Sequence, residues 1–216
     1  MSVQVAGVNG TTIQDVDPTF KAQRTTLRPY EVLGWQSFSA VSGAATVLAA
    51  SAPIFSLRNL SSNLILLRRV GVQAVVTTGF TAAQQLQVAL TVARAFTVSD
   101  SAGTAIAFTG SNQKHRTSLA TPTSLDCRIA TTTALTAGTR TLDALPLGLV
   151  SCWCTAAGVG SLIGPSPNNL LQHDTGDYPL VLAQNEGAVI TLPLVMGAGG
   201  VVTWVISAEF GEATSF

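Results

Sequence analysis

The stretch Gly187–Ala208, GAVITLPLVMGAGGVVTWVISA, decides the fold class because it has the length of a membrane helix but the pattern of strands. It holds no charged residue, yet Pro193 and the run Gly197–Gly200 interrupt it in the middle. Its flanking charges are Glu186 and Glu209, with no Lys or Arg beside it. Each half is a strand-sized run with β-branched residues, so we predict a buried β-hairpin around a glycine turn and no membrane span.

The second half of this stretch is apolar on two sides when drawn as a strand over Val201–Glu209. One face holds Val202, Trp204, Ile206 and Ala208, and the other holds Val201, Thr203, Val205 and Ser207. This pattern predicts a central strand, or a strand whose outer face is covered by another subunit.

Similar apolar runs predict strands along much of the chain. They lie at Tyr30–Ala40, Ala45–Leu48, Pro53–Asn59, Asn63–Val76, Leu147–Cys154, Tyr178–Leu182 and Ala188–Met196. Gly71 is a candidate β-bulge. Residues 80–96 fit two patterns, because Thr81 and Gln84 form a helix capping box while the following residues alternate as a strand. The strand-rich context favours a turn followed by a strand.

The polar segment 97–143 is too long for a plain loop in a compact domain, and 156–177, with Pro165 and Pro167, is a second irregular segment. We expect them to be long loop excursions, the first with short strands or a helical turn. With about eight strands and no strong helix, the chain is predicted to be all-β. The expected architecture is an antiparallel two-sheet sandwich of jelly-roll type over residues 31–216.

Residues 1–30 are predicted to form an extended N-terminal arm, since turn signals there surround few apolar residues. An arm without a dense core of its own usually lies on another surface, so it is a candidate assembly element. Its candidate contact residues are Phe20, Lys21, Arg24, Leu27 and Arg28.

The sparse charge of the chain predicts association. The 216 residues include only 11 basic and 11 acidic side chains, with no net charge. A monomer of this size exposes about 9,000 Å², which leaves about 400 Å² per charge, close to the largest apolar patch of ordinary monomers. We therefore expect copies of the chain or other proteins to cover much of its surface.

Charge is also uneven along the sequence. Residues 1–140 hold all 11 basic and 5 acidic residues, a balance of 11 − 5 = +6, and residues 141–216 hold 6 acidic residues, a balance of −6. Either strands from the two halves interleave and the asymmetry disappears in space, or complementary faces bring subunits together. We favour the first interpretation.

The odd number of cysteines, Cys127, Cys152 and Cys154, argues against a disulfide framework and fits synthesis in a reducing cytoplasm. The N-terminus lacks the charged and apolar regions of a signal peptide. Small buried hydrophobes are the favoured role of the cysteines.

No motif predicts a catalytic, cofactor or metal site. His115 with Ser118 and Asp126 resembles a hydrolase constellation only in composition. His173, Asp174 and Asp177 could bind a divalent cation such as calcium, but their spacing matches no EF-hand, and a turn is the favoured interpretation.

Two binding functions were also weighed. Nucleic-acid binding is not expected, because no basic stripe with aromatics is present. A carbohydrate-binding module needs an exposed aromatic platform. Trp35, Trp153 and Trp204 lie in apolar strand patterns and are predicted to be core.

Several phrases resemble a family of proteins from tailed bacteriophage genomes. They are Gly79–Phe96, Thr109–Ser118, Arg128–Asp143 and Pro179–Gly187, within a resemblance that covers roughly residues 35–210. The arm is the part that matches least, and no functional residue is carried across.

The resemblance implies a structural protein of the virion without a catalytic role, made in the bacterial cytoplasm. We expect a capsid decoration (cement) protein that contacts copies of itself and other virion proteins such as the major capsid protein. The alternatives are a tail, collar or baseplate protein, or a carbohydrate-binding module that contacts the host surface.

Overall fold

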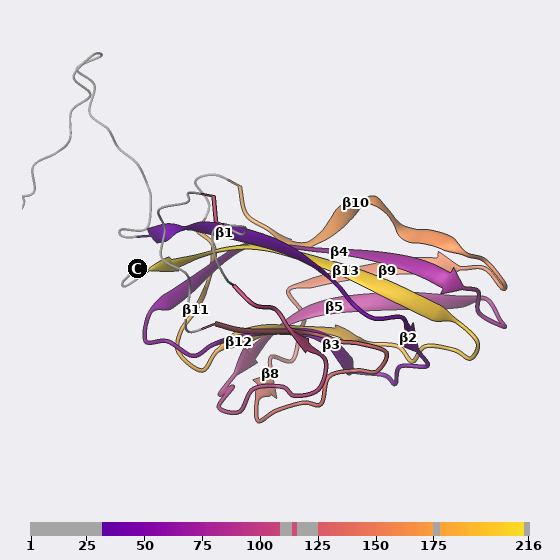
Figure 1. The fold of residues 1–216 in the computed structure, drawn as a ribbon, viewed down its shortest axis with the longest axis horizontal. Helices are drawn as coiled ribbons and strands as arrows, with labels where there is room; N and C mark the ends of the chain where they lie inside the picture. The colour runs from indigo at the N-terminus through magenta and orange to yellow at the C-terminus, as the bar shows by residue number, and fades with distance from the viewer. Residues whose placement is uncertain (1–31, 109–113, 116–124, 175–177, 214–216) are drawn as a thin grey trace, which may run out of the picture.

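The computed structural model describes residues 32–108, 114–115, 125–174 and 178–213, and these form two antiparallel β-sheets packed face to face. The predicted all-β sandwich is confirmed (Figure 1). One sheet has the order β1-β13-β4-β10, with β2 beside β13 and β11 beside β4. The other has the order β6-β7-β3-β12-β5-β8, with β9 also beside β5.

The six-stranded sheet contains β1 (Val32–Val41), β2 (Ala45–Thr46), β4 (Leu64–Thr78), β10 (Gly160–Gln172), β11 (Leu180–Leu182) and β13 (Val201–Ala213). The seven-stranded sheet contains β3 (Ala52–Asn59), β5 (Gln84–Arg94), β6 (Thr104–Ala105), β7 (Leu125–Ile129), β8 (Thr141–Leu142), β9 (Gly148–Cys154) and β12 (Gly187–Leu192). Residues 84–94 are a strand, as the alternation there predicted.

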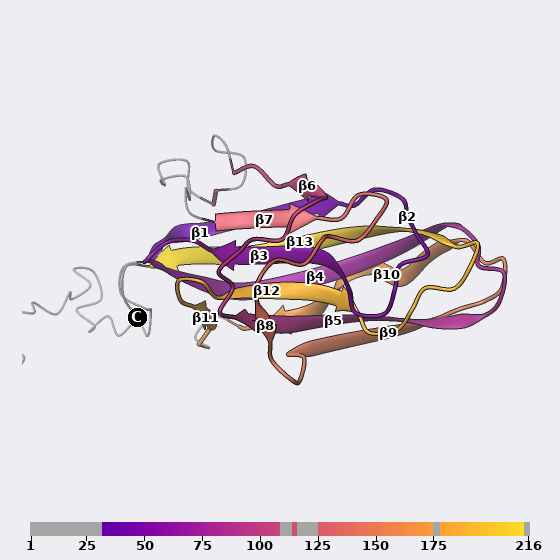
Figure 2. The ribbon, with the colours of Figure 1, turned by 90° about the horizontal axis from the view of Figure 1, so that it is seen from below.

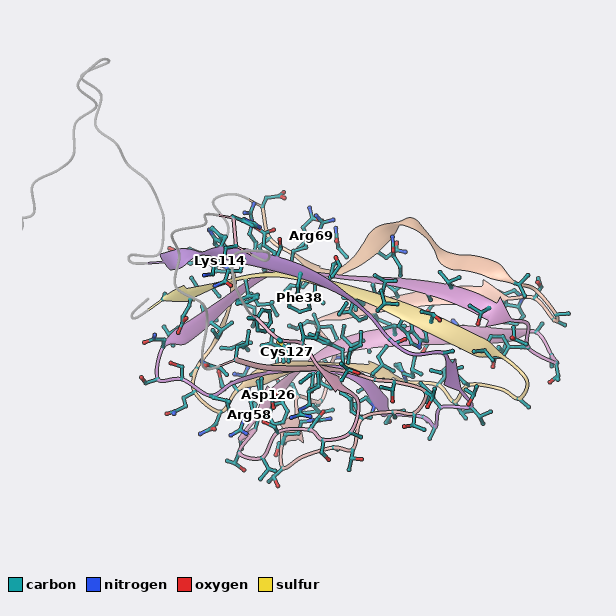
Figure 3. The ribbon with its side chains drawn as sticks, viewed as in Figure 1. Phe38, Arg58, Arg69, Lys114, Asp126 and Cys127 are labelled. Carbon is teal, nitrogen blue, oxygen red and sulfur yellow. The ribbon has the colours of Figure 1, made fainter. Side chains whose placement is uncertain are left out.

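The core lies between the sheets. Strands such as β13 and β7 contribute alternate residues, whereas β3 and β12 are buried along nearly their whole length. On β13, Val202, Trp204 and Ile206 are fully buried while their neighbours are partly exposed, so this strand is central, as predicted. An aromatic cluster continues the core, since Phe38 and Phe210 both pack edge-on against Phe108 with ring centroids 5.5 Å apart. Figure 3 shows Phe38 pointing into the space between the layers.

The predicted hairpin at Gly187–Ala208 is wrong, because its two strands belong to different sheets. β12 pairs with β3 and β5, whereas β13 pairs with β1, β2 and β4. Residues 193–200 cross from one layer to the other (Figure 1). The crossing is tight, since a Cβ on Gly200 would lie 2.0 Å from the Phe80 ring. Local alternation identified both strands but not the sheet to which each belongs.

The first excursion, 97–143, contributes to the core in addition to covering it. Its strand β7 extends the seven-stranded sheet beside β3, and Phe108, Leu125 and Cys127 from this segment are buried. The short strands expected there are present as β6, β7 and β8.

The second excursion, 156–177, contains a strand that the sequence interpretation missed. β10 runs antiparallel to β4, but its register shifts between Ile163 and Asn168, where the partners change only from Ala74 to Val72. Pro165 and Pro167 lie within this shift. Because proline has no backbone N–H to donate, the strand leaves its partner at the prolines and rejoins it afterwards.

An irregularity lies beside Gly71, but the extra residue is on the partner strand. Asn169 opposes Gly71 and Leu171 opposes Val70, so β10 carries one more residue here than β4. Against β13, Gly71 pairs with Ser207 in unbroken register, and β4 has its own extra residues between Thr78 and Val76 and between Arg69 and Leu67. Thr77 and Arg68 are therefore the extra residues on β4.

Candidate functional site

The outward face of β9 and of the loop before it is the main concentration of exposed apolar side chains in the described residues. Trp153 is 66% exposed, Leu149 53% and Leu147 49%. Leu145, in the loop, is 79% exposed. Exposure alternates along β9, so Leu149, Ser151 and Trp153 share the outward side. We call Leu145, Leu147, Leu149, Ser151 and Trp153 the β9 face.

No charged side chain is contributed by this part of the chain. Residues 144–173 contain no Asp, Glu, Lys or Arg, and this is the longest such stretch in the sequence. The adjacent strand β5 places Gln85 directly across from Trp153 and Gln87 across from Ser151. The β9 face is thus an apolar surface bordered by neutral amides.

Strand β9 is an edge strand within the described fold, since β5 is its only sheet partner there. Figure 2 shows β9 along one margin of the sheet, with β6 and β7 at the opposite margin. Natural sheets protect such edges with charges, prolines or bulges. β10, the neighbouring edge of the other sheet, has the prolines and register shifts described above, whereas β9 has none of these devices.

The inward side of β9 is fixed to the core. Cys154 is buried, and Cys152 is partly buried next to the main hydrophobic cluster. Burial, together with the neighbouring Cys152, raises the pKa of Cys154 to about 12. Burial also raises the pKa of Cys127 and of Cys152. At neutral pH these thiols stay protonated, which fits their predicted role as small hydrophobes.

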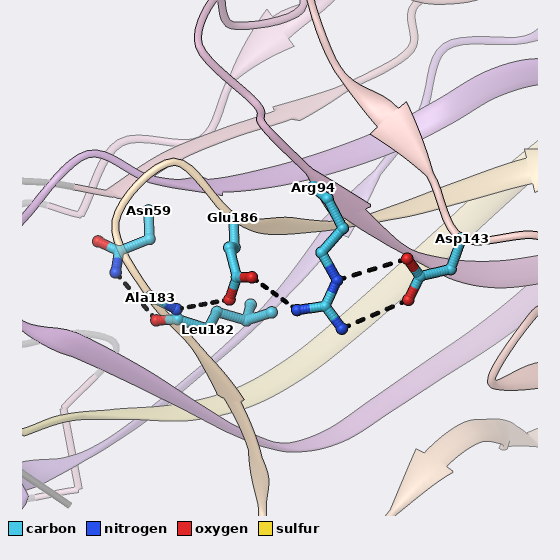
Figure 4. A network of polar contacts seen from close by, with 6 residues as sticks. All are labelled: Asn59, Arg94, Asp143, Leu182, Ala183 and Glu186. Carbon is cyan, nitrogen blue, oxygen red and sulfur yellow. Dashed lines mark hydrogen bonds and ion pairs between the residues drawn. The ribbon is translucent and has the colours of Figure 1, made fainter.

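A contrasting, charged corner lies at the other end of β5. The Arg94 guanidinium donates to Glu186 at 2.6 Å and to Asp143 at 3.4 Å, and Glu186 accepts a further bond from the Ala183 backbone N–H (Figure 4). These contacts, chiefly the one with Glu186, raise the pKa of Arg94. In the six-stranded sheet, Arg68 on β4 forms an ion pair with Glu209 on the neighbouring strand β13, at 3.2 Å.

In these ion pairs, basic residues of the first part of the chain are neutralised by acidic residues of the second part within the same molecule. Arg68 and Arg94 come from the basic part of the chain, and Glu209, Glu186 and Asp143 come from the acidic part. Interleaving strands, the favoured interpretation, account for these contacts.

Deeper in this corner, Phe96 anchors the first excursion. The guanidinium groups of Arg58 and Arg140 lie 5.7 and 5.1 Å from its ring centroid. Arg140 forms an ion pair with Asp100, and both side chains are almost fully buried. Asp100 also accepts a hydrogen bond from the Gly138 backbone N–H at 2.9 Å. Burial lowers the pKa of Arg140.

A hollow of about 420 Å³ opens on the six-stranded sheet, lined by residues that include Ser37, Arg69 and Glu209. At its rim, Ser37 Oγ and His115 Nε2 lie 2.9 Å apart. Nucleophilic catalysis needs a group that orients the imidazole and donors for an oxyanion. Among the described residues, no carboxylate pairs with His115. Asp126, the acid that the sequence offered, is paired with Arg128 at 3.3 Å.

The other residues singled out in the sequence fall in different places. The arm contacts Phe20, Lys21, Arg24, Leu27 and Arg28 lie outside the described residues, as do Ser118 and Asp177. The His173 backbone N–H donates to the Arg68 carbonyl at 3.0 Å, and the His173 carbonyl accepts from the Arg68 Nε at 3.3 Å. Within the described residues, no group of three His, Cys, Asp or Glu side chains is placed to hold a metal ion.

The prediction that all three tryptophans are core is wrong for Trp153. Trp204 is fully buried, and Trp35 is partly exposed with the Arg68 guanidinium 5.6 Å from its ring centroid. Trp153 lies on an edge strand, where the apolar pattern no longer implies burial. The signal that could have located this face is the charge-free stretch 144–173.

Comparison of the chain with protein-family models, curated proteins and solved structures finds no match. In the described part of the chain, no helical segment has the length and apolar character needed to cross a bilayer.

Proposed function

We propose that this chain is a non-enzymatic structural protein of a bacteriophage particle, a capsid decoration protein that stabilises the shell through contacts between copies and with the major capsid protein. The observation that carries the proposal is the β9 face, a cluster of exposed leucines and a tryptophan in a chain with only 22 charged residues, 11 of each sign. An apolar surface of this kind is typical of a subunit that is covered in its assembly.

Two features of the fold support the proposal. Antiparallel sheets with a shared core give a rigid wall, and both excursions are tied into that wall, the first by Phe108 and β7 and the second by β10. The sequence resemblance to phage proteins agrees with this role.

The test is the copy number of the chain in purified particles, measured by quantitative mass spectrometry against the major capsid protein. A decoration protein predicts hundreds of copies per particle. A handful of copies would favour the collar, tail or baseplate alternative, and absence from purified particles would overturn the structural role.

One observation favours a second candidate function, glycan binding. Trp153 is exposed and faces Gln85 across the strand pair, so an aromatic ring and an amide are available side by side for a sugar. Titration with host surface polysaccharide, monitored by tryptophan fluorescence, tests it. Binding that is lost in both Trp153→Ala and Gln85→Ala would support this function, and an unchanged spectrum would exclude it for that polysaccharide.

A further inference from the structure

We propose that the β9 face docks against the β9 face of a second copy of this chain, with the two strands antiparallel about a two-fold axis that passes close to Ser151. This inference deepens the proposed function and rests on it for its biological role, since a decoration protein that acts through oligomeric contacts needs a contact between copies.

The first argument is the chemistry of the occupant. The face offers leucine and tryptophan side chains with no charge from residues 144–173, so its partner must also be apolar and uncharged at the contact. The β9 face itself meets that requirement. Gln85 and Gln87 on β5 lie beside the outward residues and supply a neutral polar rim.

The second argument is self-complementarity. A two-fold contact requires that residue i meets residue j and that j meets i. Leu149, Ser151 and Trp153 are evenly spaced on the outward side of β9. An axis at Ser151 therefore places each Leu149 opposite the tryptophan of the other copy, and the small serines face each other at the centre. The contact then has two Leu–Trp pairs that flank a small centre, and each pair occurs twice, as two-fold symmetry requires.

The third argument is the unprotected edge. β9 has no charge, proline or register shift, whereas β10 has the last two. Such devices keep other chains away from a sheet margin, so their absence leaves the approach of a second copy to the outward face of β9 unobstructed. The inward side of β9 is already occupied by the core through Cys154, which leaves the outward side for the second copy.

A charge-swap experiment on the full chain tests this geometry, with association measured by analytical ultracentrifugation over a concentration series. Leu149→Glu and Trp153→Lys each bury an unpaired charge and should weaken association at least about ten-fold. The double variant Leu149→Glu/Trp153→Lys should recover most of it, because the two-fold axis brings opposite charges together twice.

The double variant isolates the intermolecular contact, because positions 149 and 153 are about 13 Å apart along one strand and do not pair within a molecule. Leu149→Lys/Trp153→Lys is the like-charge control and should stay dissociated. Val41→Lys is the matched surface control, since Val41 is 61% exposed on β1, the edge strand of the other sheet. It should associate like the unmodified chain.

Two results would overturn the inference: association that none of the β9 variants weakens, or single variants that dissociate with no recovery in the charge swap.

If a charged variant fails to fold, a cross-linking experiment with Ser151→Cys replaces the charge swap. A bismaleimide of about 10 Å, the spacing of packed sheets, should cross-link two copies at this position but not at Val41→Cys. Equal cross-linking at both sites would also overturn the inference. Copy number in particles is measured separately, so failure here and failure of the proposed function are distinguishable.

Discussion

Strands β8 and β9 lie on the same side of β5 and show two different ways of ending a sheet. At the β8 end, Arg94 pairs with Asp143 and Glu186, and the buried pair Arg140–Asp100 lies behind it. At the β9 end, the outward residues are apolar and the surrounding sequence has no charge. The first end is completed by interactions within the chain, whereas the second is completed, in our proposal, by another copy.

The largest expected effect is at the charged end. Arg140→Ala removes one partner of a buried ion pair and should lower the free energy of unfolding by about 3–5 kcal/mol, because Asp100 stays buried without its counter-charge. Chemical denaturation measures this. The matched control is Arg128→Ala, which breaks a more exposed pair in the same excursion and should cost no more than about 1 kcal/mol. Equal losses of unfolding free energy in the two variants would show that burial of the Arg140–Asp100 pair does not increase its contribution to stability.

A smaller effect is expected where β9 meets the opposite sheet. A Cβ on Gly148 would lie 1.9 Å from the Leu170 carbonyl oxygen, so Gly148→Ala should destabilise the fold by about 1–3 kcal/mol through overpacking. Ser151→Ala, on the exposed side of the same strand, should change stability by no more than about 0.5 kcal/mol. An unchanged free energy of unfolding in Gly148→Ala would mean that β9 and β10 are not held together at this point.

The exposed ion pairs of Arg94 at the β8 end should contribute less to stability. Arg94 is 46% exposed, so Arg94→Met should cost less than about 1 kcal/mol, and the cost should shrink at high salt as the ion pairs are screened. Thermal unfolding at low and high salt measures this. A large loss that salt does not change would show that the aliphatic part of the side chain carries the contribution.

The smallest effect at neutral pH is expected from the inward side of β9. The raised pKa of Cys154, about 12, means that its thiol ionises in the unfolded chain before it does so in the folded chain. Stability should be unaffected below about pH 9, and it should fall as the pH rises from there towards 12. Chemical denaturation of the unmodified chain and of Cys154→Ala across this pH range measures the fall in stability. A dependence that is the same in both proteins would assign the fall to other groups.

Much of the fold was predictable because strand alternation is a local property. The strand around Trp204 follows directly from the apolar period, and its burial alternates in the same way. The strands around Leu57 and Val88 follow from their apolar runs, and most of their residues are buried on both faces. The sheet to which a strand belongs is not local, which is why β12 and β13 were joined in a hairpin. β10 was missed because Pro165 and Pro167 interrupt its pattern, and only pairing with β4 reveals that the strand continues.

The candidate site was less predictable than the fold. Trp153 has the same apolar neighbours as a core residue, and its exposure follows from the edge position of β9, which no local pattern specifies. Sparse charge predicts that part of the surface is covered, and the charge-free stretch 144–173 contains the exposed apolar β9 face. The arm residues singled out from the sequence remain a prediction.

The central claim, that the chain does not function as an isolated monomer, is tested most directly by its molar mass in solution. Light scattering after size exclusion, at micromolar concentration, should give at least twice the 22.2 kDa of one chain. A single species of 22.2 kDa that stays monomeric for days would contradict the account.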